Sequence, residues 1–75
     1  MNDRLFRTIL KRYEAVIEDA HYKIDIICEQ NLVIPEHIDI TGEIDKLLQI
    51  IAEAEDKLTV IKKYYGKKTT ESHVL

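Results

Sequence analysis

The sequence predicts an all-α protein: a two-helix antiparallel hairpin over about residues 3–30 and 41–65, completed to a four-helix bundle by dimerisation or by a partner. Apolar residues recur at steps of three and four along both segments, and Pro35 lies between them. Such spacing places the apolar side chains on one side of an α-helix. A proline disfavours helix at the residue before it, so Pro35 separates the two segments.

The first predicted helix starts at Asn2 or Asp3, because either side chain can accept a hydrogen bond from an amide of the first turn. It runs to about Glu29–Asn31, since asparagine can close a helix in the left-handed conformation. Its apolar stripe contains the following residues: Phe6, Ile9, Leu10, Tyr13, Val16, Ile17, Ala20, Ile24 and Ile27. A stripe this wide can contact two neighbouring helices.

The joint between the helices, residues 32–41, is unusually apolar for an exposed turn. Its apolar members are Leu32, Val33, Ile34, Ile38 and Ile40. They are interpreted as a cap on the closed end of the bundle; a contact patch for a partner is the alternative.

The second predicted helix begins near Thr41, a fair N-cap residue, with Glu43 in the positive first turn. It ends before Gly66, a typical stop signal. Its seven seam residues are Ile44, Leu47, Ile51, Ala54, Leu58, Ile61 and Tyr65. Residues 1–66 therefore form one hairpin domain, and residues 67–75, which lack periodicity, are predicted to be a flexible tail.

Chain length favours association. A domain of 75 residues buries a small share of its surface, and in a lone hairpin each helix meets only one neighbour. We expect the partner to be a second copy, as a homodimer, or another helical protein. The predicted interface consists of Phe6, Ile9, Tyr13, Val16, Ile17, Ile24, Ile27, Ile44, Leu47, Ile51, Leu58, Ile61 and Tyr65.

The net charge of the chain is −3, and the charged residues are unevenly distributed along the sequence. Residues 1–12 carry +3 and residues 62–68 carry +4, whereas residues 13–61 carry −9. An antiparallel hairpin brings both basic runs to its open end. This end is either a solvated surface, with lysines at a helix C-terminus, or a contact for an anionic partner, for which the candidate residues are Arg4, Arg7, Lys11, Arg12, Lys62, Lys63, Lys67 and Lys68. That partner is either an acidic protein surface, including the middle of a second copy, or nucleic acid, against which the negative net charge argues.

Some of the charge supports the helices. Asp3/Arg7, Asp19/Lys23 and Glu53/Lys57 are i, i+4 pairs in the favourable order and are predicted to support the helices as ion pairs.

No catalytic, metal or cofactor site is predicted. Glu18 and His21 have the Glu-x-x-His spacing of di-iron bundles, but Ala20 is the inward residue and no second such pair exists. Cys28 has no histidine within helical reach. The chain is therefore not expected to be an enzyme.

Cys28, the single cysteine, cannot form an internal disulfide, which favours a reducing compartment. No apolar run reaches the roughly 18 residues of a membrane span. We therefore expect a cytoplasmic protein without membrane contact.

The stretch Leu47-Leu48-Gln49-Ile50-Ile51-Ala52-Glu53-Ala54-Glu55, continued through Ile61 and Tyr64-Tyr65, resembles the two-helix co-chaperones of type III secretion needle subunits. The resemblance implies a helical hairpin that holds an aggregation-prone helical subunit in the cytoplasm. Together these observations predict a non-enzymatic protein–protein interaction module, chaperone- or adaptor-like, acting by helix packing. The alternative is a small nucleic-acid-binding or transcriptional regulatory dimer that uses the basic open end.

Overall fold

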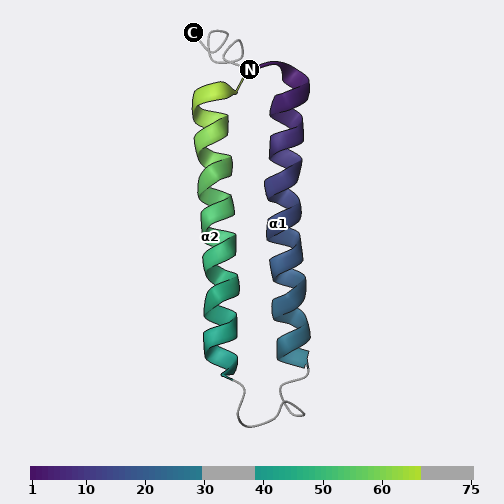
Figure 1. The fold of residues 1–75 in the computed structure, drawn as a ribbon, viewed down its shortest axis with the longest axis vertical. Helices are drawn as coiled ribbons and strands as arrows, with labels where there is room; N and C mark the ends of the chain where they lie inside the picture. The colour runs from purple at the N-terminus through teal and green to yellow at the C-terminus, as the bar shows by residue number, and fades with distance from the viewer. Residues whose placement is uncertain (30–38, 67–75) are drawn as a thin grey trace, which may run out of the picture.

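The computed structural model describes residues 1–29 and 39–66, and within these ranges the chain is a helical hairpin without strands. Helix α1 spans Asp3–Glu29 and helix α2 spans Ile40–Tyr65, and the two lie side by side in antiparallel orientation (Figure 1). The predicted two-helix hairpin is confirmed. The interpretations of residues 30–38 in the joint and of the tail 67–75 lie outside the described residues.

Helix α1 begins as the sequence predicts. The Oδ1 atom of Asn2 accepts a hydrogen bond from the backbone N–H of Leu5 at 2.8 Å. The carbonyl of Asn2 accepts another from the N–H of Phe6 at 3.0 Å. Asn2 therefore satisfies the first amides of the helix, which have no intrahelical partner. The last described residue of the helix is Glu29, so the predicted continuation toward Asn31 lies outside the described residues.

Helix α2 begins one residue earlier than predicted, and Asp39 rather than Thr41 is its N-cap. The Asp39 carboxylate accepts hydrogen bonds from the Gly42 N–H and the Thr41 hydroxyl, each at 3.0 Å. A carboxylate is a better acceptor for orphan amides than a hydroxyl and also complements the positive helix end, so it displaces the predicted cap. A Cβ on Gly42 would overlap the Asp39 carboxylate, which explains a glycine in this first turn.

Helix α2 ends where the sequence predicts, at Tyr65 before Gly66. The N–H of Gly66 donates to the carbonyl of Lys62 at 3.2 Å, and a Cβ on Gly66 would lie 2.5 Å from that oxygen. Lys62 and Lys63 occupy the last turn, where their positive charges stabilise the helix by interacting with the negative end of its dipole.

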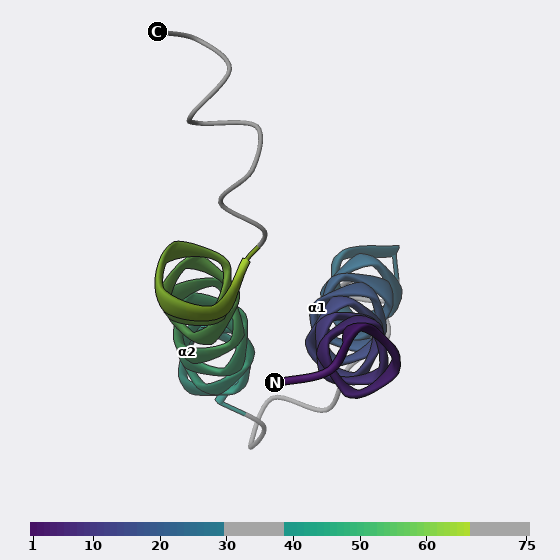
Figure 2. The ribbon, with the colours of Figure 1, turned by 90° about the horizontal axis from the view of Figure 1, so that it is seen from above.

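The core between the helices is shallow. Only Ala20, Ala54, Ile51 and Ile61 are buried among the described residues, with exposed fractions of 1%, 3%, 7% and 7%. The two most buried residues are alanines, one on each helix, so small side chains occupy the middle of the seam. Viewed from above, the pair has no third described element over either face (Figure 2). Each helix is therefore covered by one neighbour only.

Candidate protein-binding surface

The predicted seam lies between the two helices along nearly its whole length. Ile51 and Ile61 are buried, whereas the other predicted interface residues on the seam are half-buried. Those half-buried residues are Phe6, Ile9, Tyr13, Val16, Ile17, Ile24, Ile27, Ile44, Leu47 and Leu58. The packing of α1 on α2 thus involves the residues of the predicted interface. Many of these residues remain partly accessible to solvent.

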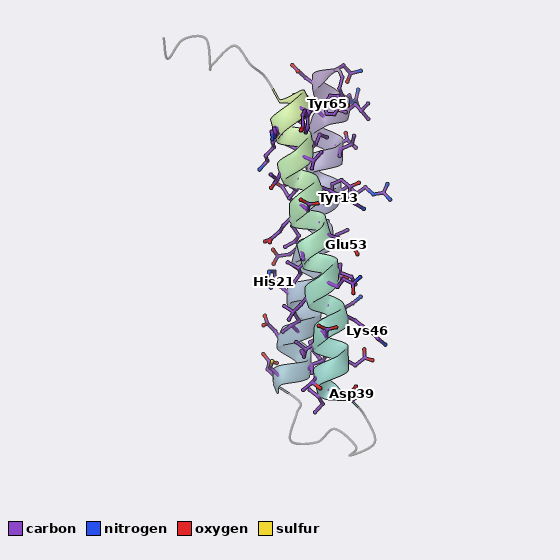
Figure 3. All side chains as sticks on the ribbon, turned by 90° about the vertical axis from the view of Figure 1, so that its left-hand side faces the viewer. Tyr13, His21, Asp39, Lys46, Glu53 and Tyr65 are labelled. Carbon is purple, nitrogen blue, oxygen red and sulfur yellow. The ribbon has the colours of Figure 1, made fainter. Side chains whose placement is uncertain are left out.

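Tyr65 departs from this pattern, because it is 56% exposed. It is the last residue of α2 and lies at the open end of the hairpin (Figure 3). The tyrosine therefore belongs to the accessible surface and not to the core of the single hairpin.

Eight large hydrophobic residues of the described ranges are more than 40% exposed: Met1, Leu5, Tyr22, Leu48, Ile50, Val60, Tyr64 and Tyr65. Scattered exposed hydrophobics are ordinary on a protein surface. Here seven of the eight lie on the two helices, which bury only four residues. The hairpin exposes more large apolar side chains than it buries.

One hollow lies near the closed end of the hairpin and is mainly apolar; we call it the closed-end groove. Its lining comprises Ile26 and Ile27 of α1 with Leu47 and Ile50 of α2, and Lys23, Glu43 and Lys46 form its polar part. Two of these charges are paired within their own helix: Lys23 with Asp19 at 3.0 Å, as predicted, and Lys46 with Glu43 at 3.5 Å. The groove thus has an aliphatic floor and a charged border.

A second hollow, the open-end groove, lies toward the chain termini of the hairpin. Its lining is Met1, Ile9, Tyr13, Lys57, Val60, Ile61 and Tyr65. The Nζ atom of Lys57 lies 5.4 Å from the ring centre of Tyr13. Lys57 does not form the predicted ion pair with Glu53, whose carboxylate instead accepts a hydrogen bond from Gln49 at 3.2 Å. The ammonium of Lys57 instead contacts the aromatic face of half-buried Tyr13 across the seam.

Both grooves open on the same side of the hairpin, which we call the groove side. Residues seven apart share a side of a helix, because seven residues make nearly two turns. The heptad positions flanking the seam on this side are Leu5, Arg12, Asp19 and Ile26 on α1, and Glu43, Ile50, Lys57 and Tyr64 on α2. Ile26, Glu43 and Ile50 line the closed-end groove, and Lys57 lines the open-end groove. Exposed apolar residues therefore recur at both ends of one side.

The basic residues meet at the open end, as predicted. Arg7 of α1 and Lys62 of α2 line one hollow there, together with Asp3, Phe6 and Gly66. Arg4, Lys11, Arg12 and Lys63 are exposed nearby on the same turns, whereas Lys67 and Lys68 lie outside the described residues. The open half of the hairpin, residues 1–15 and 57–66, has a net charge of +5. The closed half, residues 16–29 and 39–56, has a net charge of −8.

The hydrogen bonds at the start of α2 lower the pKa of Asp39. The hydrogen bond from the Gly42 amide, and then that from the Thr41 hydroxyl, hold the pKa of its carboxyl below the ordinary value of 3.8. The cause is helix capping, so this shift carries no indication of catalysis.

Comparison with protein-family models, with curated proteins and with solved structures finds no match. The surface must therefore be interpreted from its own chemistry.

The described residues offer little for catalysis or metal binding. Within residues 1–29 and 39–66, no cluster of three His, Cys, Asp or Glu side chains could hold a metal ion. Glu18 and His21 are exposed, with His21 projecting from the side of α1 (Figure 3). Cys28 is an exposed thiol. No helix in the described part is long and apolar enough to cross a membrane.

Sequence reasoning did not locate the two grooves or the groove side. The available signal was that Ile50, Val60 and Tyr64 are apolar residues off the seam of α2. The register of the two helices, which the sequence does not give, is what places Ile50 and Tyr64 on the same side of the hairpin as Ile26.

Proposed function

We propose that this chain is a small interaction module whose hairpin completes its core by packing against another helical chain, in a chaperone- or adaptor-like role. The observation that carries the proposal is the balance of burial: four small or aliphatic residues are buried, and eight large hydrophobics are exposed. Covering one large apolar side chain contributes about 1.5–3 kcal/mol. A partner helix laid along the groove side would cover several of them.

The two grooves suit a helical partner in particular. Helix-in-groove recognition uses apolar anchors spaced by three, four and seven residues, with charges at the border of the contact. The closed-end groove has that composition, with aliphatic Ile26, Leu47 and Ile50 between charged Lys23 and Lys46. An exposed cysteine without a disulfide suits a reducing compartment, so the proposal places the protein in the cytoplasm.

The test asks whether the isolated chain folds stably as a monomer without a partner. Light scattering on a sizing column gives its mass, circular dichroism gives its melting curve at several concentrations, and an apolar dye reports exposed apolar surface. We expect either an associated species or a weakly folded monomer that binds the dye. A monomer that melts cooperatively at a high, concentration-independent temperature and binds no dye would contradict the proposal.

A matched pair of variants locates the surface. Ile50→Glu places a charge in the closed-end groove, whereas Thr59→Glu places the same charge on an exposed position of the same helix. Association or dye binding should fall in Ile50→Glu and persist in Thr59→Glu. Equal behaviour of the two variants would show that the groove side is not used.

A second candidate is nucleic-acid binding at the open end, favoured by Arg7 and Lys62 lining one hollow from two helices. Fluorescence anisotropy with a labelled single-stranded oligonucleotide tests it. Binding of this kind should weaken steeply with salt, because each phosphate contact releases counterions. The −8 charge of the closed half opposes it. Affinity that is absent at low salt would remove this candidate.

A further inference from the structure

We infer that the partner on the groove side is a second copy of this chain, packed antiparallel so that the open end of each hairpin lies on the closed end of the other. This inference rests on the proposed function and specifies its partner. Three features of the described residues carry it: complementary apolar surfaces at the two ends, opposite charge in the two halves, and a symmetric register of heptad positions.

The apolar surfaces of the two ends differ in kind. The closed end has a groove with an aliphatic floor of Ile26, Ile27, Leu47 and Ile50. The open end has large projecting side chains on the same side of the hairpin, with Leu5, Tyr64 and Tyr65 at 48%, 59% and 56% exposure. An antiparallel pair brings the projecting residues of each copy to the groove of the other, whereas a parallel pair brings groove to groove.

The distribution of charge also favours the antiparallel pair. The open half carries +5 and the closed half −8. Antiparallel packing places each positive half beside the partner's negative half, and parallel packing places like charges together. Complementary potentials across an interface fix its register and suppress the like-charged alternative.

The heptad positions of α1 on the groove side form a pattern that is symmetric about the middle of the helix. Leu5 and Ile26 are apolar, and Arg12 and Asp19 between them have opposite charge. A two-fold axis between residues 15 and 16 brings Leu5 to Ile26 of the partner subunit and Arg12 to Asp19 of the partner subunit. An isologous two-fold interface requires this reciprocity, since every contact occurs twice. In a parallel pair, the two-fold axis would run along the helices and place α1 on α2 of the partner subunit, so this reciprocity within α1 would be lost.

The opposite side of the hairpin is the competing surface. It carries half-buried Leu10, Ile17 and Ile24 with exposed Leu48. Its aliphatic residues on α1 are already partly covered by α2, and only Leu48 on this side exceeds 40% exposure. The groove side therefore has more exposed large apolar residues to bury, and both of its grooves are mainly apolar.

Crosslinking of single-cysteine variants tests both the orientation and the side. Leu5→Cys and Ile26→Cys are each made in a Cys28→Ser background of the full chain and treated with a short bismaleimide, separately and as an equal mixture. Residues 5 and 26 are about 31 Å apart along α1, so a short reagent cannot join them within one helix. Ile17→Cys in the same background reports on the opposite side.

The inference expects a dimer mass by light scattering and a covalent dimer only in the mixture of Leu5→Cys and Ile26→Cys. Covalent dimers in each variant alone, or a dimer mass without a covalent dimer in the mixture, would overturn the inference, because parallel packing places α1 on α2 of the partner subunit. A covalent dimer of Ile17→Cys would place the interface on the opposite side and also overturn it. A wild-type monomer that is weakly folded and binds the apolar dye would overturn the second copy as partner, while the proposed function would stand. A stable monomer without dye binding would overturn both.

Discussion

Lys57 of α2 lies with its ammonium nitrogen 5.4 Å from the ring centre of Tyr13 of α1, so a cation–π contact joins the two helices within the open-end groove. A contact of this kind contributes about 0.5–1 kcal/mol at an accessible site. It is the one cation–π pair in the described residues that connects the helices, since Lys63 and Tyr64 are neighbours on α2.

A double-mutant cycle measures that contact. Tyr13→Leu and Lys57→Gln, made singly and together, should show a coupling of about 0.5 kcal/mol in the free energy of unfolding by urea. Tyr13→Phe retains the ring and is the matched control, so the coupling in its cycle with Lys57→Gln should be close to zero. Equal coupling in the Tyr13→Leu and Tyr13→Phe cycles would assign the effect to the hydroxyl and contradict the cation–π contact.

The alanines at the centre of the seam set the approach of the helices. Ala20→Leu and Ala54→Leu should destabilise the hairpin by about 1–3 kcal/mol, because a larger side chain has no space there. Ala15→Leu and Ala52→Leu place the same change at exposed positions of the same helices and should be nearly neutral. Urea titration of the four variants checks this, and equal losses at all four positions would be incompatible with the seam.

Burial also separates two neighbouring positions of α2. Ile51→Lys should unfold the hairpin or cost several kcal/mol, because it buries an unpaired charge at a position that is 7% exposed. Leu48→Lys alters a residue that is 51% exposed and should leave the helical content unchanged. Circular dichroism distinguishes them. A normally folded Ile51→Lys variant would exclude the seam assignment of α2.

The N-cap of α2 gives a pH-dependent contribution to stability. Because folding lowers the pKa of Asp39, the contribution is complete above the ordinary value of 3.8 and is lost as the pH falls through the lower folded value. Asp39→Ala should therefore lower the melting temperature at pH 7. On acidification, the melting temperature of this variant should fall less than that of the wild type. Asp39→Asn retains an acceptor and should keep most of the stability at pH 7 with a weaker acid dependence. A wild-type acid profile in Asp39→Ala would disprove the capping role.

The sequence was sufficient for the architecture because apolar periodicity and helix-end chemistry are local. The stripe of α1, its start at Asn2 and the end of α2 at Gly66 all follow from residues within a few positions of one another. The cap of α2 was misassigned because Asp39 competes with Thr41 only two residues away, and a small shift of the start decides between them. Boundaries of this kind are determined by hydrogen-bond geometry, which spacing alone does not specify.

The surface was less predictable, because it depends on the register between the helices. Lys57 has Glu53 as a helical neighbour, and local rules therefore predicted an ion pair. The contact with Tyr13 depends on the register of the helices, which determines the turn of α1 that lies opposite Lys57. The same holds for the closed-end groove, whose lining joins Ile26 to Ile50 across the seam.

The shallow core has a consequence for how long the chain survives. A hairpin held by four buried residues opens readily, and proteases cleave opened chains in proportion to their population. Under the proposed function, binding by a partner lowers that population by mass action. The abundance of this protein would then follow that of its partner, with unassembled copies removed by degradation before they accumulate.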